Sequence, residues 1–210
     1  MKDLPPLRSA QISCIEPLAG HVTLRAQKSR RGRNAAFVRS DVTGEAGLGL
    51  SATVVFTNSL ESKIYWNETP APDVPSVEET NGSYRRNRNF LLNNFNWSHA
   101  IAHTDLPSPD VSRWIQLEQR EGLDPMVELI AIGDALPPAA AVLAKGPTPL
   151  STMTWLLNML TPAPKTWDGW WLILATANYA ENGCSSQSMG VWNRDGEPVA
   201  TAVQSVALFG

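Results

Sequence analysis

The sequence predicts an α+β fold, because runs with the period of a strand dominate it and one stretch with the period of a helix stands among them. Alternating runs broken by turn residues fill residues 10–57. Alternation returns at 111–119 and in further runs after residue 150, while apolar residues recur at helical spacing between Asp124 and Pro137. One helix and a curved antiparallel sheet must bury each other's apolar faces, so we expect the sheet to pack against this helix.

The N-terminal part predicts antiparallel strands joined by turns. Turn signals rich in glycine stand at 19–20, 31–34 and 44–49 and separate the alternating runs. We expect the first strand to pair with the second as a hairpin. The predicted strands cover residues 10–16, 21–28, 34–42 and 49–57.

The middle of the chain has a different character. The stretch "NETPAPDVPSVEETNGSYRRNRN" holds three prolines and many polar residues without a sustained period, which is typical of a linker or surface excursion. A short strand is expected within 90–100. We therefore divide the chain into an N-terminal unit at 1–60, a linker and surface excursion at 61–109, and a C-terminal unit at 110–210.

The predicted helix has clear start and stop signals. Asp124 suits the N-cap and Pro125 the first helical position, and Pro137 ends the helix because residues before a proline avoid the α region. Asp134 lies four residues after Ile130, so it continues the buried stripe and would face the sheet. Alternatively, the helix has already ended there and Asp134 is a solvated turn residue. The stripe comprises Met126, Val127, Leu129, Ile130 and Gly133.

The C-terminal unit contains one strand before the helix and a series of strands after it. The later strands are expected at 150–160, 169–179, 184–193 and 198–209, with the second and third of them paired. A similar strand series fills the first 57 residues, but no helix precedes it. This similarity indicates a weak internal duplication of an α+β unit, the first copy lacking its front end.

Three polar residues occupy positions that look buried. Gln204 shares a strand face with small apolar residues, where an amide without partners is costly. Thr152 and Thr154 share a face with Leu150 and Leu156, although threonine is also an ordinary strand residue.

A carboxylate, a hydroxyl and an amide that converge between helix and sheet could hold one water molecule. Asp134 would accept its proton, and Thr152 and Gln204 would orient it. Such a site suits hydrolysis of an activated acyl group. The chain shows no G-x-S-x-G nucleophile elbow and no cysteine–histidine pair at a diagnostic spacing.

Composition excludes several classes of function. The net charge of −3 implies no general affinity for nucleic acid. No apolar run is long enough to span a bilayer. Cys14 and Cys184 are two isolated thiols, and no secretion signal opens the chain, so a cytoplasmic location is expected.

No metal or cofactor is expected. His99 and His103 are four residues apart, but no cysteine or acidic cluster accompanies them. The basic groups at 28–33 and 84–88 are most simply solvated turns, and a second interpretation is that they attract an anionic ligand carrying phosphates.

An ordered set of segments resembles one known family. "RRGRNAAFVRSDVTGEAGLGLSATVVF" resembles the first-half hairpin of double hot-dog thioesterases, and "DPMVELIAIGDALPP", "PLSTMTWLLNMLTPAPKTWDGWWLI" and "GVWNRDGEPVATAVQSVALFG" resemble their second half. The chain is thus similar to the type II acyl-CoA thioesterases over most of 8–57 and 90–210. The resemblance implies a double hot-dog, in which each curved antiparallel sheet wraps a central helix. The first unit here would lack its first strand and helix.

The resemblance also implies site residues. Enzymes of this family orient the hydrolytic water with an Asp, a Ser or Thr, and a Gln. Asp134, Thr152 and Gln204 match these positions, with Thr154 as a nearby substitute for the hydroxyl. Two positions depart from some relatives, which carry a histidine after the Thr and an acidic residue after the Gln; here they are Trp155 and Ser205.

The implied function is acyl-CoA thioester hydrolysis, with acyl-CoA as the partner and assembly as a homo-oligomer of hot-dog units. The thioester carbonyl is expected near backbone N–H groups of Leu123, Asp124 or Met126 at the start of the helix. The alternative is a non-catalytic acyl-CoA-binding or assembly protein with the same fold. A hot-dog dehydratase ranks third, because that chemistry needs a histidine base and residues 104–210 contain no histidine.

Overall fold

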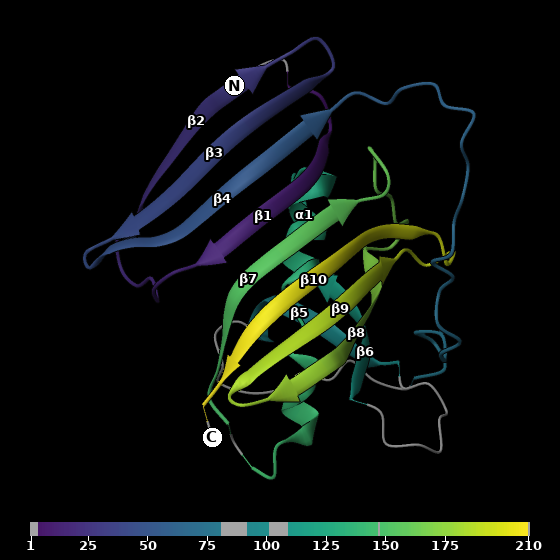
Figure 1. The fold of residues 1–210 in the computed structure, drawn as a ribbon. Coiled ribbons are helices and arrows are strands. Elements are labelled where there is room, and N and C mark those ends of the chain that lie inside the picture. Colours follow the sequence, from purple (N-terminus) through teal and green to yellow (C-terminus); the bar gives the residue numbers. More distant parts are fainter. Residues whose placement is uncertain (1–3, 81–91, 101–108, 147, 210) are drawn as a thin grey trace.

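A computed structural model describes residues 4–80, 92–100, 109–146 and 148–209. Strands dominate these residues, with one α-helix among them (Figure 1). In chain order the elements are β1 (Leu7–Cys14), β2 (Thr23–Arg31), β3 (Ala35–Gly44), β4 (Gly47–Thr57), η1 (Leu92–Asn94), β5 (Phe95–His99), β6 (Asp110–Leu117), α1 (Pro125–Gly133), η2 (Ala139–Leu143), β7 (Leu150–Met159), β8 (Trp170–Glu181), β9 (Cys184–Trp192) and β10 (Pro198–Leu208). None of the helices in these residues is long and apolar enough to cross a membrane.

All described strands join one antiparallel sheet in the order β2-β3-β4-β1-β7-β10-β9-β8-β6-β5. The order β1-β4-β3-β2 in the first half recurs as β7-β10-β9-β8 in the second, and β1 pairs with β7 where the halves meet. The internal duplication that the sequence indicated is therefore present in the topology. The two equivalent sets of strands lie side by side in one continuous sheet, which is joined where β1 pairs with β7.

The predicted hairpin between the first two strands is wrong. β1 pairs with β4 on one side and with β7 on the other, so neither of its edges is left for β2. β2 instead pairs with β3 at the far end of the sheet. The connection from β1 to β2 therefore passes over the ends of β3 and β4, where the Leu18 side chain meets Gly44 and Gly49.

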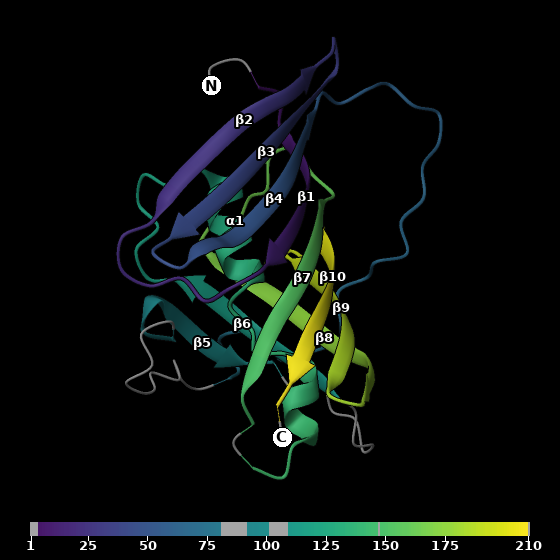
Figure 2. The ribbon, with the colours of Figure 1, turned by 60° about the vertical axis from the view of Figure 1, so that its left-hand side comes forward.

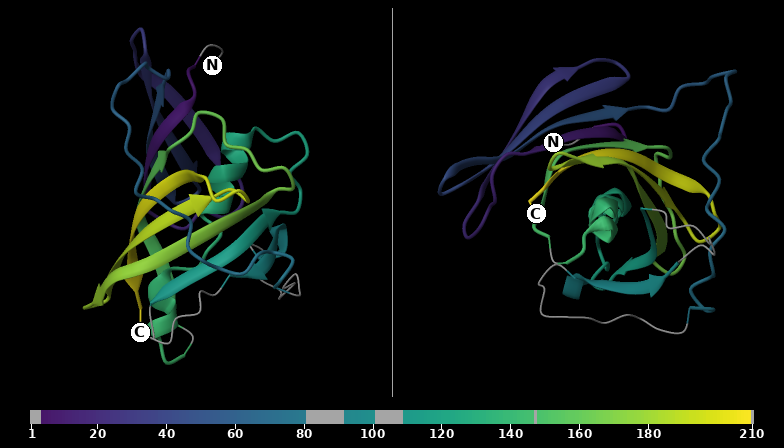
Figure 3. Two further views of the ribbon diagram at one scale, coloured as in Figure 1. Left: turned by 90° about the vertical axis from the view of Figure 1, so that its right-hand side faces the viewer. Right: turned by 60° about the horizontal axis from the view of Figure 1, so that its bottom comes forward.

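The C-terminal half of the sheet curls around α1, whereas the strands β2, β3 and β4 extend away from it (Figures 2 and 3). We call the face of the sheet that is turned toward α1 the inner face. The hydrophobic core between this face and the helix includes Leu129 and Ile132 of α1, Leu157 of β7, Ile173 of β8 and Val191 of β9. This arrangement is the sheet-around-helix fold that the sequence predicted. The described residues 4–60 contain four strands and no helix, and Leu24 of β2 is 68% exposed.

The predicted surface excursion crosses the outer face of the sheet. Its residues Ala71, Val74 and Val77 pack against a hydrophobic cluster that includes Trp114 and Trp192. The two indole groups also hold its backbone: Trp192 Nε1 donates to the Thr69 carbonyl at 2.9 Å, and Trp114 Nε1 donates to the Pro75 carbonyl at 2.9 Å. The short strand expected within 90–100 is β5, which pairs with β6. The basic group at 84–88 and His103 lie outside the described residues.

Candidate functional site

Gln204 lies on the inner face, in a row of residues that pair directly across the sheet. Ile12 of β1 is opposite Trp155 of β7, Trp155 is opposite Gln204 of β10, and Gln204 is opposite Gln187 of β9. Directly opposed residues of an antiparallel pair point to the same face. Gln204 is only 6% exposed and Gln187 is fully buried, so this row places two amides in the core.

A bulge brings Thr152 to the same face. The register passes from Ser205↔Thr154 to Val206↔Thr152, which leaves Met153 of β7 as the extra residue. Thr152 consequently pairs with a buried inner-face residue and is itself half-buried. Thr154 faces the outer side and is exposed, so the expectation that both threonines share a face is wrong.

A chain of hydrogen bonds links the amides to Thr152. The backbone N–H of Ala139 donates to Gln187 Oε1 at 2.7 Å, and Gln187 Nε2 donates to Gln204 Oε1. Gln204 Nε2 then donates to Thr152 Oγ1 at 2.8 Å. The Thr152 oxygen accepts this bond, so its own O–H and its second lone pair remain for another molecule.

Asp134 follows the second of the two sequence interpretations. α1 ends at Gly133 and Asp134 is its C-cap, with its N–H donating to the Ile130 carbonyl at 3.2 Å. The residue is exposed to solvent. Nevertheless, desolvation by the surrounding protein raises the pKa of its carboxyl group above the ordinary value. Asp134 is therefore an exposed residue at the helix end, as the second interpretation held, and the expectation that it continues the buried stripe is wrong.

The position of Asp134 relative to the sheet follows from its neighbours. A Cβ on Gly133 would lie 3.2 Å from Cζ2 of Trp155, which is the residue opposite Gln204. The charge of Asp134 also raises the pKa of the Cys14 thiol, after the larger effect of desolvation. Asp134 thus lies at the end of α1 that meets β1 and β7. Its carboxylate forms no hydrogen bond with Thr152 or Gln204 among the interactions of the described residues.

The family follows from the chain's similarity to known sequences. The family described as "Acyl-CoA thioesterase C-terminal domain" matches residues 67–208, more than half of the chain. The chain belongs to this family. All three candidate residues and the complete β6–β10 segment with α1 fall inside the match. No curated protein matches the chain.

Solved structures agree on the fold of this thioesterase family member. A protein from Alicyclobacillus acidocaldarius, described as having a hot-dog fold, superimposes with a TM-score of 0.85 at 20% identity, covering 100% of this chain and 81% of that one. Acyl-CoA thioesterase II TesB2 from Mycobacterium marinum gives a TM-score of 0.77 at 13% identity, covering 97% and 80%. The tesB protein of Mycobacterium avium subs paratuberculosis gives 0.76 at 18% identity, covering 98% and 79%. The double hot-dog prediction is thereby confirmed at the level of fold.

For this thioesterase family member, the oxyanion donors expected at the start of α1 and the candidate residues lie at different ends of the helix. The start of α1 was predicted to supply oxyanion donors, but the candidate residues gather at its other end. A helix of nine residues is about 13 Å long at 1.5 Å per residue. Moreover, the Met126 N–H is already taken by the Asp124 side chain at 2.8 Å. Donors at Leu123, Asp124 or Met126 therefore cannot serve a carbonyl beside Asp134.

Two residues of the site were missed from the sequence. Gln187 holds Gln204, and Trp155 lies between Gln204 and Ile12 on the inner face. Gln187 has a sequence signal: in "CSSQSMGVW" it alternates with Met189 and Val191, two apolar residues that prove to be buried. Trp155 was noted only as a departure from relatives.

Cys14 is poorly suited to act as a nucleophile. The pKa of the Cys14 thiol is raised, which disfavours the thiolate that a nucleophilic cysteine needs. In the parts of the chain that the structure describes, no three His, Cys, Asp or Glu side chains gather as a metal site.

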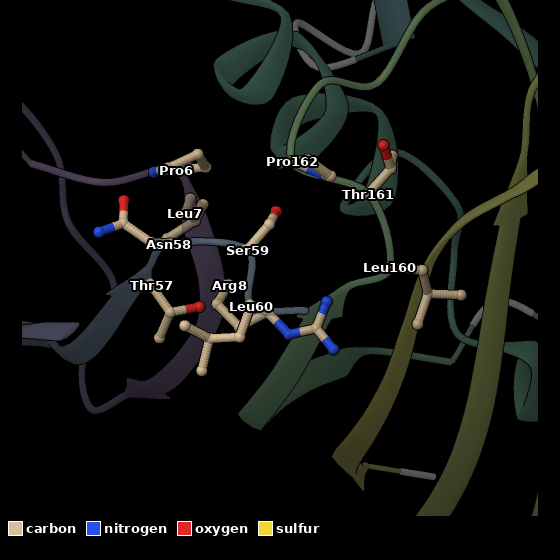
Figure 4. Close-up of a pocket in the computed structure, with 10 residues that line it drawn as sticks. All are labelled: Pro6, Leu7, Arg8, Thr57, Asn58, Ser59, Leu60, Leu160, Thr161 and Pro162. Carbon is tan, nitrogen blue, oxygen red and sulfur yellow. The ribbon is translucent and has the colours of Figure 1, made fainter. Parts of the chain in front are cut away.

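A pocket of about 330 Å³ lies away from these residues (Figure 4). It sits where the start of β1 approaches the ends of β4 and β7, and Arg8 within it donates from Nη1 to the Met159 carbonyl at 2.5 Å. Thr152 is near the opposite end of β7. The pocket therefore does not belong to the candidate site. Its lining comprises Pro6, Leu7, Arg8, Thr57, Asn58, Ser59, Leu60, Leu160, Thr161 and Pro162.

Proposed function

We propose that this chain hydrolyses acyl-CoA thioesters with a water molecule held at the C-terminal end of α1. The observation that carries the proposal is the hydrogen bond from Gln204 Nε2 to Thr152 Oγ1, made on the inner face beside the helix end that bears Asp134. Membership of the acyl-CoA thioesterase family supports the reaction class.

The chemistry assigns one role to each residue. The Thr152 hydroxyl, fixed by Gln204, orients the water. Asp134 takes a proton from this water while the water oxygen attacks the thioester carbonyl carbon. The tetrahedral intermediate then collapses, the carbon–sulfur bond breaks, and the departing CoA sulfur receives the proton from Asp134. The raised pKa of the Asp134 carboxyl makes it a stronger base than an ordinary aspartate.

A direct test uses purified protein and acyl-CoAs of increasing chain length, with free thiol as the readout. We expect the wild type to release CoA and Asp134→Ala to be slower by at least about a hundredfold, the usual contribution of a general base. Asp195→Ala is the matched control, because Asp195 is an exposed carboxylate in the β9–β10 turn. Equal rates for wild type and Asp134→Ala would overturn the proposal.

The second candidate is an acyl-CoA-binding protein without turnover. The departures at Trp155 and Ser205 and the absence of a helix in the described residues 4–60 favour it. Calorimetry distinguishes the two candidates: binding of acyl-CoA without thiol release from any substrate of the panel would select the second.

A further inference from the structure

The indole N–H of Trp155 is a buried donor without an acceptor. The side chain is 5% exposed, and no hydrogen-bond partner for Nε1 is present among the residues that the structure describes. An unsatisfied buried N–H costs about 1–3 kcal/mol, so native structures rarely retain one without a use. Among the described residues, this N–H is therefore a donor whose hydrogen bond is left for a bound molecule.

The ring is oriented so that its N–H edge lies by the end of α1. The ring atom closest to the Gly133 position is Cζ2, which is bonded to the same ring carbon as Nε1. The N–H and the Gly133 contact thus share one edge of the indole. Asp134 is the next residue of the chain, and Gln204 is the cross-strand neighbour of Trp155.

Glycine at position 133 allows this approach. A Cβ there would lie 3.2 and 3.3 Å from ring atoms Cζ2 and Cη2 of Trp155, closer than most side-chain contacts. The absence of a side chain at Gly133 lets the helix end pack closely on the ring. The packing therefore fixes the Trp155 ring between the helix end and the sheet.

We propose that the Trp155 indole N–H is the hydrogen-bond donor for the thioester carbonyl oxygen. This inference rests on the proposed function, and it replaces the donors expected at the start of α1. An indole N–H donates only, so it can neither accept a proton nor act as a base. It suits an oxygen that gains negative charge as the carbonyl π electrons move onto it during attack by water.

The three groups then divide the reaction without overlap. Asp134 accepts the proton of the water, Thr152 with Gln204 orients the water, and Trp155 stabilises the oxyanion. When the intermediate collapses, the oxyanion electrons re-form the carbonyl and the carbon–sulfur bond breaks. The donor returns to its starting state without transferring a proton.

The kinetic test compares Trp155→Phe, which removes the N–H and keeps an aromatic ring, with Trp155→His, which restores an aromatic N–H donor. We expect Trp155→Phe to lower kcat by about a hundredfold or more, as for loss of one oxyanion donor, with little change in KM. Trp155→His should recover part of kcat. Trp192→Phe is the control, because its indole N–H serves Thr69 on the outer face. Unchanged kcat in Trp155→Phe would overturn the inference.

A second measurement separates this inference from the proposed function and needs no variant to be active. The indole nitrogens are labelled with nitrogen-15, and the resonance missing from Trp155→Phe is assigned to Trp155. An acyl-CoA ketone analogue, with CH₂ in place of sulfur, should shift that resonance in the wild type, whereas CoA alone should not. A shift in a protein that releases no thiol would refute hydrolysis but retain the donor. The absence of a shift at saturating analogue, or the absence of binding, would overturn the inference.

Discussion

The side-chain Nε2 of Gln187 donates a hydrogen bond to the side-chain Oε1 of Gln204, and both side chains are buried. This bond decides which end of the Gln204 amide faces Thr152. Because Oε1 of Gln204 is engaged, its Nε2 points to Thr152 and leaves the threonine O–H available. Gln187, in turn, is fixed by the backbone N–H of Ala139 at the start of η2.

Gln187→Leu is expected to lower both stability and activity. The change leaves the Ala139 N–H and the Gln204 carbonyl oxygen without their partner, at about 1–3 kcal/mol for each buried unsatisfied group. Denaturant unfolding and kcat of the same preparation measure the two effects. Gln11→Leu provides the control, because Gln11 lies one residue before Ile12 on β1 and is exposed on the outer side. Wild-type stability for Gln187→Leu would contradict the network.

The two threonines of β7 should behave differently. Thr152→Val removes the hydroxyl bound to Gln204, and we expect kcat to fall by about tenfold or more, since one hydrogen bond of about 1.4 kcal/mol corresponds to a factor of ten. Thr154→Val alters an exposed outer-face hydroxyl and should leave kcat unchanged. Initial rates at saturating acyl-CoA compare them. If Thr154→Val were the slower variant, the bulge would not determine which threonine acts.

A double-mutant cycle tests whether Thr152 and Gln204 act as a unit. Thr152→Val and Gln204→Leu each break the same hydrogen bond, so the double variant should be little slower than the slower single variant. Rates for the four proteins, measured with one substrate, give the coupling. Fully additive losses would mean that the two side chains contribute separately.

Local patterns predicted the elements but not their partners. The period-two runs placed the paired strands β8 and β9 correctly, and Gly183 in the turn between them has a positive φ of 75°. The pairing of β1 with β4 and β7 joins residues far apart in the chain, which no local signal records. The predicted pairing of β1 with β2, its neighbour in the chain, is therefore wrong.

The same limit applies to the candidate site. Gln204 could be placed on a buried face by counting along its strand, and its burial is confirmed. Thr152 and Thr154 could not be told apart, because the bulge at Met153 becomes visible only when β10 is aligned beside β7. The role of Gln187 in holding Gln204 can be recognised only when the register of β9 with β10 is known.

The pH dependence of stability should report on Asp134. Its pKa is raised in the folded chain, so between the unfolded and folded pKa values the native state holds a proton that the unfolded chain has released. The free energy of unfolding therefore falls as pH rises through that window and stays lower above it. Asp134→Asn removes this loss, so the variant should be more stable than wild type at neutral pH and similar below the window.

Activity should move in the opposite direction. We expect kcat/KM of the wild type to rise with pH through a pKa above the ordinary aspartate value of 3.8, as the base loses its proton. Asp134→Asn should lack this limb and be slower by about a hundredfold or more. Thermal unfolding and pH–rate profiles of both proteins provide the check. A variant that is more stable and equally active would remove Asp134 from the mechanism.

Gly133→Ala should be harmful although it replaces glycine by the best helix former. In an exposed helix this change is expected to stabilise by about 0.5–1 kcal/mol. Here the added methyl group would lie 3.2 Å from the buried Trp155 ring, which is packed between α1 and the sheet and has little room to move. We therefore expect a lower Tm and a lower kcat, because the ring and its N–H would be displaced together.

Gly146→Ala is the matched control, since nothing lies within 4 Å of a Cβ at that position. It should leave both the Tm and kcat close to wild type. Thermal unfolding together with thiol-release rates distinguishes two origins of any defect in Gly133→Ala. A fall in Tm with unchanged kcat would indicate packing strain alone, whereas a fall in kcat that Trp155→Phe does not increase further would place Gly133 and Trp155 in one functional unit. A Tm above that of wild type would show that the helix end does not press on the ring.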